Sequence, residues 1–451
     1  MTELRILSPT AILGYGFPVS SFEAGLRRNP HVIAVDAGST DPGPYYLGAG
    51  VCFTERRAVK RDLQLILQAA LPRRSRVIIG SAGGSGANCH LERDLGILRE
   101  LAAELQLHFT VAVIQAEIAK ESLLALWREG KITPLAPAPD LTEADIVEST
   151  RVVGQMGMDP ILRALDSNAD VILAGRCYDP AVFAALPVRE GFDPGLAIHL
   201  GKILECAAIA ATPGSGSDCL FGTIYPDHFT VEPLNSNRRC TTLSVAAHTL
   251  YEKSNPYLLP GPGGMLDLRQ TQFEQVTAAQ VRVSGSRFSQ SEPYRIKLEG
   301  ARRLGFRTIA IAGVRDPIMI RQIDPIIAAV KERVADNFQH ESWSYHLNFT
   351  VYGKNGVMGL WEPQPFPEGH ELGIVIEAVG TTQEIANTIC GFARSTMLHY
   401  GYAGRIATAG NLAFPYSPSD FKAGEVYAFS LYHLVETDDP CRFFPMQRIE
   451  L

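Results

Sequence analysis

The sequence predicts an α/β protein with a mainly parallel, doubly wound N-terminal sheet and a second, α+β lobe at the C-terminal end. Short apolar runs alternate with amphipathic helical patterns through about residue 175, which is typical of β-α-β units. Polar or glycine-rich loops follow several of the apolar runs. The length of 451 residues, with 46% hydrophobic residues, is sufficient for a large core and more than one lobe.

Strands and helices are expected to alternate through most of the N-terminal part, with a Pro-rich linker around 134–139 between two successive helices. The expected strands are 4–7, 31–35, 76–80, 108–115 and 170–174. The expected helices are 20–28, 57–71, 89–105, 117–129 and 143–166. Such an order gives parallel strands whose connecting helices cover both faces of the sheet.

The pattern changes near residue 223, where loop residues become more frequent. Further strands are expected at 280–283, 294–298, 308–313, 345–352 and 371–378, with helices at 324–338 and 383–400. This order indicates a mixed or antiparallel sheet. We therefore expect a ligand-binding lobe over 1–222, a linking segment over 223–280 and an α+β lobe over 281–451.

Composition excludes several classes of function. The formal charge of −7 and the absence of a basic run argue against nucleic acid or an anionic membrane as the main partner. No segment has the roughly 18 consecutive apolar residues of a membrane span, and no signal peptide precedes the first strand. We expect a cytoplasmic protein, a homo-oligomer, whose ligand is a small anion.

The eight cysteines contain no C-x-x-C pair, which disfavours structural zinc and indicates that most thiols are core or loop residues. Cys89 differs from the others because it begins a predicted helix, where free amides could lower a thiol pKa. The sequence shows no residue that would be positioned beside Cys89 as a base. A thiol-dependent acyl transferase therefore remains a secondary alternative.

Residues 77–90 pass from an apolar strand through a loop of small residues into a helix. This order favours an anion site, because glycines permit close approach and a helix start offers unpaired amides. The loop lacks the G-x-G-x-x-G and Gly-Lys-Ser/Thr fingerprints of nucleotide sites, so hydride transfer is not indicated. A tight turn without a ligand is the alternative. The expected anion-binding residues are Ser81, Gly83, Gly84, Ser85, Gly86 and Asn88.

Three polar loops, 36–48, 80–90 and 175–180, each begin where a predicted parallel strand ends. The carboxyl ends of such strands meet at one edge of the sheet, so a shared cleft is expected there. Arg176 offers a planar fork for a carboxylate or phosphate, and Asp179 could orient it or act as a base. A simple Arg–Asp brace within the loop is the alternative.

The loop after the second strand carries Asp36, Ser39, Thr40 and Asp41. Two nearby carboxylates could raise one pKa and supply an acid and a base, with Asp36 as the catalytic candidate and Ser39 and Thr40 as anion contacts. They could also hold magnesium, although this is the less favoured interpretation. Turn formation within a Gly/Pro loop is the alternative.

The predicted helix 198–206 carries His199, Glu205 and Cys206. His199 and Cys206 are two turns apart, too far for a nucleophile pair, so Cys206 is expected to be a core residue. His199 and Glu205 are candidate catalytic residues.

A second cationic segment lies in the loop 235–239. Arg238 and Arg239 there could bind a carboxylate or a coenzyme A phosphate, or could instead form a salt bridge between lobes.

The chain resembles the acyclic terpene utilisation (AtuA) family. The resemblance rests on the small-residue loop 80–90, on Ala174-Gly-Arg-Cys-Tyr-Asp-Pro180 and on Ile198-His-Leu-Gly-Lys-Ile-Leu-Glu-Cys206, and it covers most of residues 1–400. It implies a cytosolic protein of catabolism acting on branched terpenoids or other small acids and their coenzyme A thioesters. It also implies a small companion subunit. The segment Asp36–Gly43 departs from the terpene-pathway members, which allows for another substrate.

These observations favour an enzyme that binds a small branched or hydroxy carboxylate, or its acyl-coenzyme A, and performs non-redox hydratase or lyase chemistry. An anion clamp, a base and an acid all have candidates in the three loops. The alternative from another class is a non-catalytic subunit that binds a metabolite or a pathway partner.

Overall fold

The computed structural model describes residues 2–251, 253–364 and 369–451, which form two compact units. Unit 1 extends to Arg302 and resumes at Phe429–Leu451, and unit 2 is Arg303–Ala428. This division differs from the expected boundaries. The expected linking segment and the start and end of the expected second lobe all belong to unit 1.

Unit 1 is built on a ten-stranded sheet with the order β12-β13-β9-β8-β1-β2-β3-β7-β4-β19. The five central strands are parallel, which confirms the α/β prediction. They are β1 (Leu4–Ser8), β2 (Val32–Asp36), β3 (Arg76–Gly80), β7 (Val171–Ala174) and β4 (Thr110–Ile114). Each is a short run of mostly branched apolar residues that is buried on both faces, as parallel strands require.

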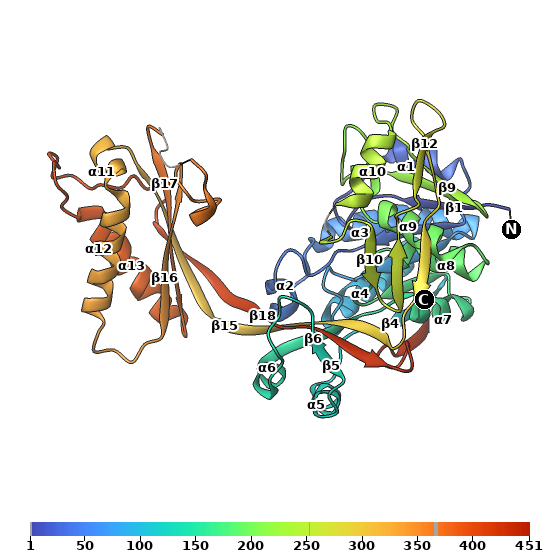
Figure 1. Cartoon of the computed structure of the whole chain (residues 1–451), viewed down its shortest axis with the longest axis horizontal. Coiled ribbons are helices and arrows are strands. Elements are labelled where there is room, and N and C mark those ends of the chain that lie inside the picture. Colours follow the sequence, from blue (N-terminus) through green and yellow to red (C-terminus); the bar gives the residue numbers. More distant parts are fainter. Residues whose placement is uncertain (1, 252, 365–368) are drawn as a thin grey trace. The chain divides into compact units, whose positions relative to one another are not determined.

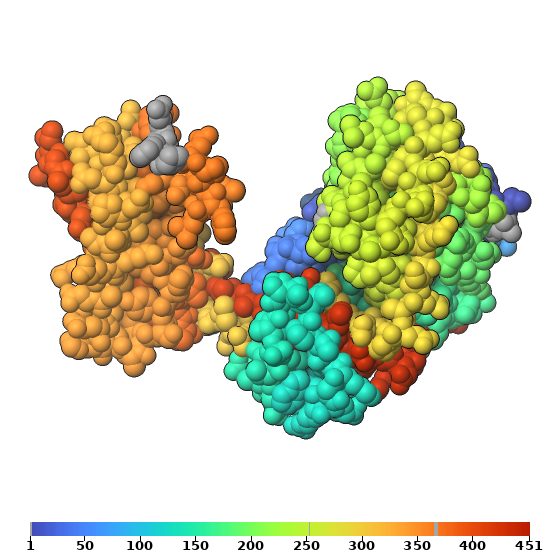
Figure 2. All heavy atoms as spheres, in the orientation of Figure 1, coloured from blue at the N-terminus to red at the C-terminus, as the bar shows by residue number. Residues whose placement is uncertain are grey.

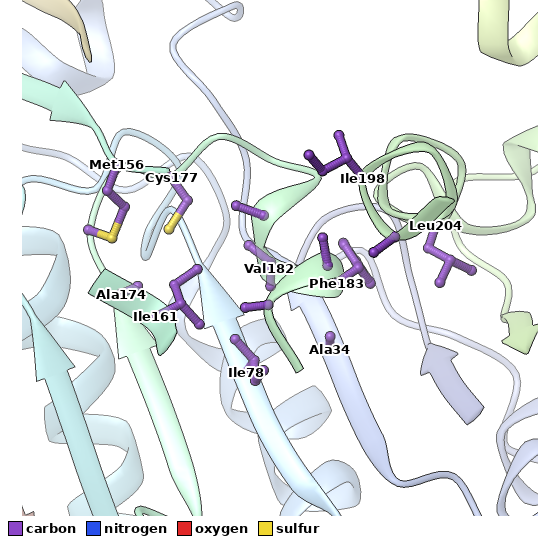
Figure 3. Close-up of a cluster of buried hydrophobic side chains, with 14 of the residues drawn as sticks. Ala34, Ile78, Met156, Ile161, Ala174, Cys177, Val182, Phe183, Ile198 and Leu204 are labelled. Carbon is purple, nitrogen blue, oxygen red and sulfur yellow. The ribbon is translucent and has the colours of Figure 1, made fainter. Parts of the chain in front are cut away.

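One face of this sheet is covered by α7 (Met158–Asp166), α8 (Ala181–Arg189) and α9 (Pro194–Leu204). Figure 3 shows side chains of α8 and α9 beside those of the strands. The labelled members of this core are Ala34, Ile78, Ala174, Met156, Ile161, Cys177, Val182, Phe183, Ile198 and Leu204.

The opposite face is covered by α1 (Val19–Leu26), α3 (Arg56–Arg73) and α4 (Asn88–Leu105). Side chains that alternate with those of the first core, such as Ile33, Ile79 and Leu173, point to this side. Two separate cores on the two faces make the sheet doubly wound, as the sequence predicts.

Antiparallel strands extend the sheet at both edges. Beyond β1 lie β8 (Leu220–Ile224), β9 (His228–Pro233), β13 (Val281–Ser284) and β12 (Gln272–Gln275), and beyond β4 lies β19 (Met446–Glu450). Local pattern predicts few of these strands, because each is only four to six residues long. The segment 223–280 is therefore part of the lobe rather than a linker.

The smaller elements of unit 1 lie around this sheet. A three-stranded sheet joins β10 (Leu258–Gly261), β11 (Gly264–Asp267) and β14 (Arg287–Gln290), and it packs on α9. The other short elements are α2 (Tyr45–Ala49), α5 (Lys120–Arg128), the 3-10 helix Ala207–Ala210 and α10 (Thr242–Leu250).

The expected helix 143–166 is wrong in its middle. The chain forms α6 (Glu143–Glu148), then the strand β6 (Ser149–Gln155), then α7. Strand β6 pairs with the long strand β15 (Tyr294–Val314), and β5 (Ile132–Pro134) pairs with β18 (Asp420–Thr437). Pairing with a distant strand overrides the local helical pattern here.

Unit 2 has the order β15, α12, β16, β17, α13, β18, with the strands arranged β16-β17-β15-β18. This β-α-β-β-α-β order is that of the ferredoxin-like topology. Its elements are α11 (Pro317–Arg321), α12 (Ile323–Asn337), β16 (Tyr345–Tyr352), the 3-10 helix Gly359–Trp361, β17 (Leu372–Gly380) and α13 (Gln383–His399). Figure 1 shows α12 and α13 on one face of β16 and β17, where they form a separate core.

Distant parts of the chain share the surface of unit 1. Figure 2 shows the turquoise residues around α5 and α6 next to red residues near the C-terminal end. The return of the chain after β18 places Phe444 in the main core. Among the described residues, every helix is too short or too polar to cross a lipid bilayer.

Candidate active site

The three polar loops meet at the carboxyl ends of β2, β3 and β7, which are neighbours in the sheet. Asp36 lies opposite Gly80 in the register of β2 and β3. The Ser81 amide donates a hydrogen bond of 3.0 Å to the carbonyl oxygen of Gly175. The loops expected to share a cleft are thus held together by their own backbone.

Arg176 is 2% exposed and makes several hydrogen bonds within this cluster. Its Nε donates to Glu299 Oε2 at 2.7 Å, and its Nη1 donates to Asp179 Oδ1 at 2.8 Å and Ser81 Oγ at 3.2 Å. Burial alone would lower the pKa of Arg176, but the two carboxylates outweigh it and raise the pKa. The guanidinium is therefore always charged, and within the described part of the chain its Nη2 makes no hydrogen bond.

Glu299 on β15 is a member of this cluster that the sequence did not suggest. It is fully buried and accepts hydrogen bonds from Arg176, from Thr40 Oγ1 at 2.9 Å and from Lys297 Nζ at 2.6 Å. Burial would raise the pKa of Glu299, but Arg176 and Lys297 lower it to about 2. The sequence feature that could have indicated Glu299 is a single carboxylate among the apolar and small residues 298–301. Its partner Arg176 lies 123 positions away in the chain.

Asp36 has the opposite electrostatic environment. Its side chain is 6% exposed, its Oδ2 accepts from the Gly38 amide at 3.1 Å, and its Oδ1 is buried without a hydrogen-bond partner among the described residues. Burial and the charge of Asp179 raise the pKa of Asp36 well above its ordinary value, against the effect of Arg176. Both effects favour the neutral, proton-bearing form of the carboxyl group.

Ser81 turns the chain out of β3. It is fully buried with φ 48°, a conformation unusual for a residue other than glycine, and its Oγ accepts hydrogen bonds from Arg176 and from the Cys177 amide at 3.2 Å. These bonds hold the strained turn in place and connect it to the loop that carries Arg176.

The amides of the small-residue loop are mostly bonded within the protein. Gly83 donates to Asp94, Gly84 to the Ser81 carbonyl, Gly86 to the Ala82 carbonyl and Asn88 to Glu117 Oε2 at 2.9 Å. These four amides are thus not free for an anion in this structure. The Ser85 hydroxyl and the Asn88 side-chain oxygen, in contrast, are buried without a partner among the described residues.

Gly86 is needed for close packing against the loop that carries Arg176. Its φ is 67°, and a Cβ atom would lie 2.0 Å from the backbone nitrogen of Arg176. We expect Gly86→Ala to lower the free energy of unfolding by about 2–3 kcal/mol, from overpacking and the left-handed backbone. Chemical denaturation measures this loss.

The control is Gly96→Ala in α4, where a Cβ atom meets nothing within 4 Å. That change should be neutral or stabilise the helix by up to about 1 kcal/mol. Equal effects at the two positions would contradict the close contact between Gly86 and the loop that carries Arg176.

The loop after β2 divides into two parts with different roles. Ser39 Oγ donates to Asp41 Oδ2 at 2.8 Å and accepts from the Asp41 amide, which forms a local turn of the kind weighed as the alternative. Thr40 instead points to Glu299. Across the described residues, no three His, Cys, Asp or Glu side chains come together in a way that could hold a metal ion.

His199 belongs to a different part of unit 1. Its ring nitrogens bond to Ser286 Oγ at 2.6 Å and Thr249 Oγ1 at 3.0 Å, and burial lowers the pKa of His199 to about 3. Its bonding partners thus place this neutral ring outside the Asp36 cluster.

Glu205 follows α9 and is 7% exposed. It pairs with Lys202 Nζ at 2.7 Å. Its charge contributes to the raised pKa of Asp36, so Glu205 lies within electrostatic reach of the cluster.

Arg238 lies apart from these loops. Its Nε donates to Asp218 Oδ2 at 2.8 Å, and the Pro213 carbonyl accepts from its Nη1. Arg238 therefore forms a salt bridge within unit 1, whereas the alternative interpretation was a salt bridge between lobes. Its Nε and Nη1 are both engaged in these bonds. Arg239 is exposed and pairs through its backbone with Thr212.

The thiols do not have the lowered pKa of reactive cysteines. Burial raises the pKa of Cys89 despite the opposing charge of Arg151, and burial raises the pKa of Cys206 to about 12. The Asn88 amide at the start of α4 is already occupied by Glu117, whose charge also raises the pKa of Cys89. The helix start therefore does not activate Cys89.

Comparison with known proteins gives one match. The family model described as acyclic terpene utilisation family protein AtuA matches residues 56–217 and 228–415. No curated protein and no solved structure matches the chain. The matched residues include the small-residue loop, Arg176, Asp179 and Glu299, and they make up more than half of the sequence. The chain therefore belongs to the acyclic terpene utilisation (AtuA) family.

Proposed function

We propose that unit 1 is an enzyme that binds a small branched or hydroxy carboxylate, or its coenzyme A thioester, and moves a proton through Asp36 in a non-redox hydratase or lyase reaction. Family membership suggests involvement in acyclic terpene utilisation. The observation that carries the proposed chemistry is the buried Asp36 carboxyl, whose Oδ1 has no hydrogen-bond partner among the described residues and whose pKa is raised, in the same cluster as a charged arginine.

A neutral carboxyl at the carboxyl ends of parallel strands is suited to general acid catalysis. In the hydration direction, the water oxygen bonds to the β-carbon of an α,β-unsaturated acyl group, and the π bond between the α- and β-carbons breaks as its electron pair takes the proton of Asp36 at the α-carbon. The second proton of the water returns to Asp36, so atoms and charge balance. The same residue serves elimination in reverse.

Arg176 would hold the substrate through Nη2. Its Nε and Nη1 are fixed by Glu299, Asp179 and Ser81, which leaves the two N–H groups of Nη2 in a defined direction. A donor that is held in place before binding stabilises a carboxylate or thioester oxygen at a low entropic cost. The Ser85 hydroxyl is a second donor for this role.

A thermal-shift panel of branched carboxylates, hydroxy acids and acyl-coenzyme A compounds tests the proposal. A ligand at about 100 times its dissociation constant adds about 2.7 kcal/mol to the free energy of unfolding. In Arg176→Lys the charge beside Glu299 remains but the fork is lost, so we expect about tenfold weaker binding and roughly half of that stabilisation.

The matched control is Arg189→Lys, a partly exposed arginine that pairs with Asp166. It should bind each compound as the wild-type protein does. Unchanged affinity in Arg176→Lys would remove Arg176 from the site.

A second candidate is a subunit that binds a metabolite or a pathway partner without converting it. It is favoured by the two carboxylates that already occupy Arg176, since such a network can serve structure alone. Binding without turnover, in the presence of a companion subunit as well as alone, would support this candidate. A homo-oligomer is part of both proposals, and sedimentation measures it.

A further inference from the structure

Four aromatic rings form a continuous series beside the small-residue loop. Tyr15 lies 6.2 Å from Phe53, Phe53 lies 5.1 Å from Tyr46, and Tyr46 lies 5.5 Å from Tyr45, measured between ring centroids. We call these four residues the aromatic row. None of these four residues has a role in the proposed proton transfer.

The aromatic row is attached directly to the candidate active site. The Phe53 amide donates to the Gly83 carbonyl at 2.9 Å, and a Cβ atom on Gly84 would lie 3.0 Å from Phe53 Cβ. At the other end, the Leu13 amide donates to the Asp36 carbonyl at 3.1 Å. Backbone hydrogen bonds thus join the segments that carry the aromatic row to the loops of the candidate active site.

The two ends of the aromatic row are open to solvent. Tyr15 is 45% exposed and Tyr45 is 41% exposed. The blue residues of α2, which carries Tyr45, are visible at the surface of unit 1 in Figure 2. Exposed rings that touch one another offer flat faces for a planar group of a ligand.

A pocket of about 400 Å³ adjoins Tyr15. Residues 14–18 form one wall, and the backbone there is fixed because the buried Asp62 accepts from the Gly14 and Gly16 amides at 2.9 and 3.0 Å. Arg61 lines the pocket and is about half exposed, and it pairs with Asp62 at 2.7 Å and donates to the Phe17 carbonyl oxygen at 3.2 Å.

Arg57 precedes Arg61 by one helical turn of α3, so both side chains lie on the same side of that helix. Arg57 is exposed and makes no ion pair within the described part of the chain. The positive charge of Arg57 thus lies one helical turn from a residue that lines the pocket.

We propose that the aromatic row and this pocket bind the nucleotide portion of a coenzyme A thioester whose acyl group enters the Asp36 site. This inference rests on the proposed function and names its substrate class. The adenine base stacks on Tyr15 and its neighbours, and the phosphates lie near Arg57 and Arg61. A free carboxylate would fill only the inner part of the site.

The chemistry of the surface favours this occupant over a purely apolar tail. Stacking on an aromatic ring is worth about 1–3 kcal/mol per base, which corresponds to about 5- to 150-fold in affinity. Arginine binds phosphate by planar, charge-assisted hydrogen bonds. An apolar tail would gain nothing from two arginines.

Calorimetry with adenosine 3′,5′-bisphosphate and with coenzyme A tests the inference without any acyl group. Both are expected to bind the wild-type chain. Tyr15→Leu should raise the dissociation constant by about tenfold, because the stacking surface is lost. Arg57→Gln should weaken binding and reduce its dependence on salt concentration.

The control is Tyr257→Leu, which changes a tyrosine of similar exposure outside the row and should leave both affinities unchanged. Absence of nucleotide binding, or equal binding in Tyr15→Leu, would overturn the inference. Carboxylate binding that persists in that case leaves the proposed function standing. Nucleotide binding together with full turnover in Asp36→Asn would instead overturn the proposed function alone.

Discussion

Asp36→Asn is expected to lower turnover by about 10²- to 10⁴-fold while leaving ligand affinity within a factor of about three. The amide has the size of the neutral carboxyl and can occupy the same space, but it has no proton to give at neutral pH. The substrate is the panel compound that the wild-type chain converts, and steady-state kinetics separates the loss in kcat from a change in KM.

Asp41→Asn is the matched control, because Asp41 belongs to the same loop but is exposed and bonds only within its own turn. It should keep wild-type kcat. A fall of less than tenfold in Asp36→Asn, with Asp41→Asn unchanged, would contradict the assignment of Asp36 as the acid.

The same variant has a pH signature in stability that does not need a substrate. The pKa of Asp36 is raised in the folded protein, whereas the unfolded carboxyl has a pKa of about 3.9. Between these two values the folded state binds more protons than the unfolded state, so the free energy of unfolding falls as pH rises. Asparagine does not titrate, so the Asp36→Asn variant lacks this fall in the free energy of unfolding.

We therefore expect the stability of Asp36→Asn relative to the wild-type protein to increase from pH 5 to pH 8. Urea unfolding at the two pH values measures it. A constant difference between the two proteins would mean that Asp36 is ionised in the folded state.

The edge of the sheet that carries the site was predictable from local pattern. Residues 76–80 form a strand with the expected bounds, and the polar residues after β2, β3 and β7 follow from strand ends that adjoin in the sheet. A β-α-β alternation leaves few arrangements of parallel strands, because the crossovers have one hand. Asp36, Arg176 and Asp179 could thus be grouped from the sequence.

Glu299 could not be grouped with them. It reaches Arg176 from β15, which pairs with β6 across a separation of about 150 residues, and β6 itself was assigned to a helix. Pairing between distant strands depends on packing that no local window contains. The boundaries of the units were missed for the same reason, since Phe444 returns to the first core after the whole of unit 2.

His199 shows the opposite limit. A histidine, a glutamate and a cysteine on one predicted helix suggested chemistry, but the ring bonds to two hydroxyl groups inside the fold. Residue type alone does not tell which side of a fully buried helix faces a site. All residues of α9 from Gly195 to Leu204 are buried, so no polar face was present to orient it.

Arg176→Met is expected to lower the free energy of unfolding by about 3 kcal/mol. The change leaves Glu299 fully buried with Lys297 and Thr40 as its remaining partners. A buried carboxylate that loses one of two cations loses much of the interaction that compensates its desolvation. Chemical denaturation measures the loss, and Arg189→Met, which breaks a partly exposed pair, should cost less than about 1 kcal/mol.

The double variant Arg176→Met with Glu299→Gln decides whether the pair is the cause. Because the glutamine carries no charge, the double variant should be more stable than the sum of the single losses predicts, by about 1–3 kcal/mol. The loss of stability at acid pH is an independent measure of the same pair.

Glu299 has a pKa of about 2 when folded, so its contribution to the free energy of unfolding is complete above about pH 4.5 and is lost as pH falls toward 2. In Arg176→Met the free energy of unfolding should fall less steeply between pH 4.5 and pH 2. If the two single losses are additive and the pH dependence is unchanged, Arg176 stabilises the fold by packing alone.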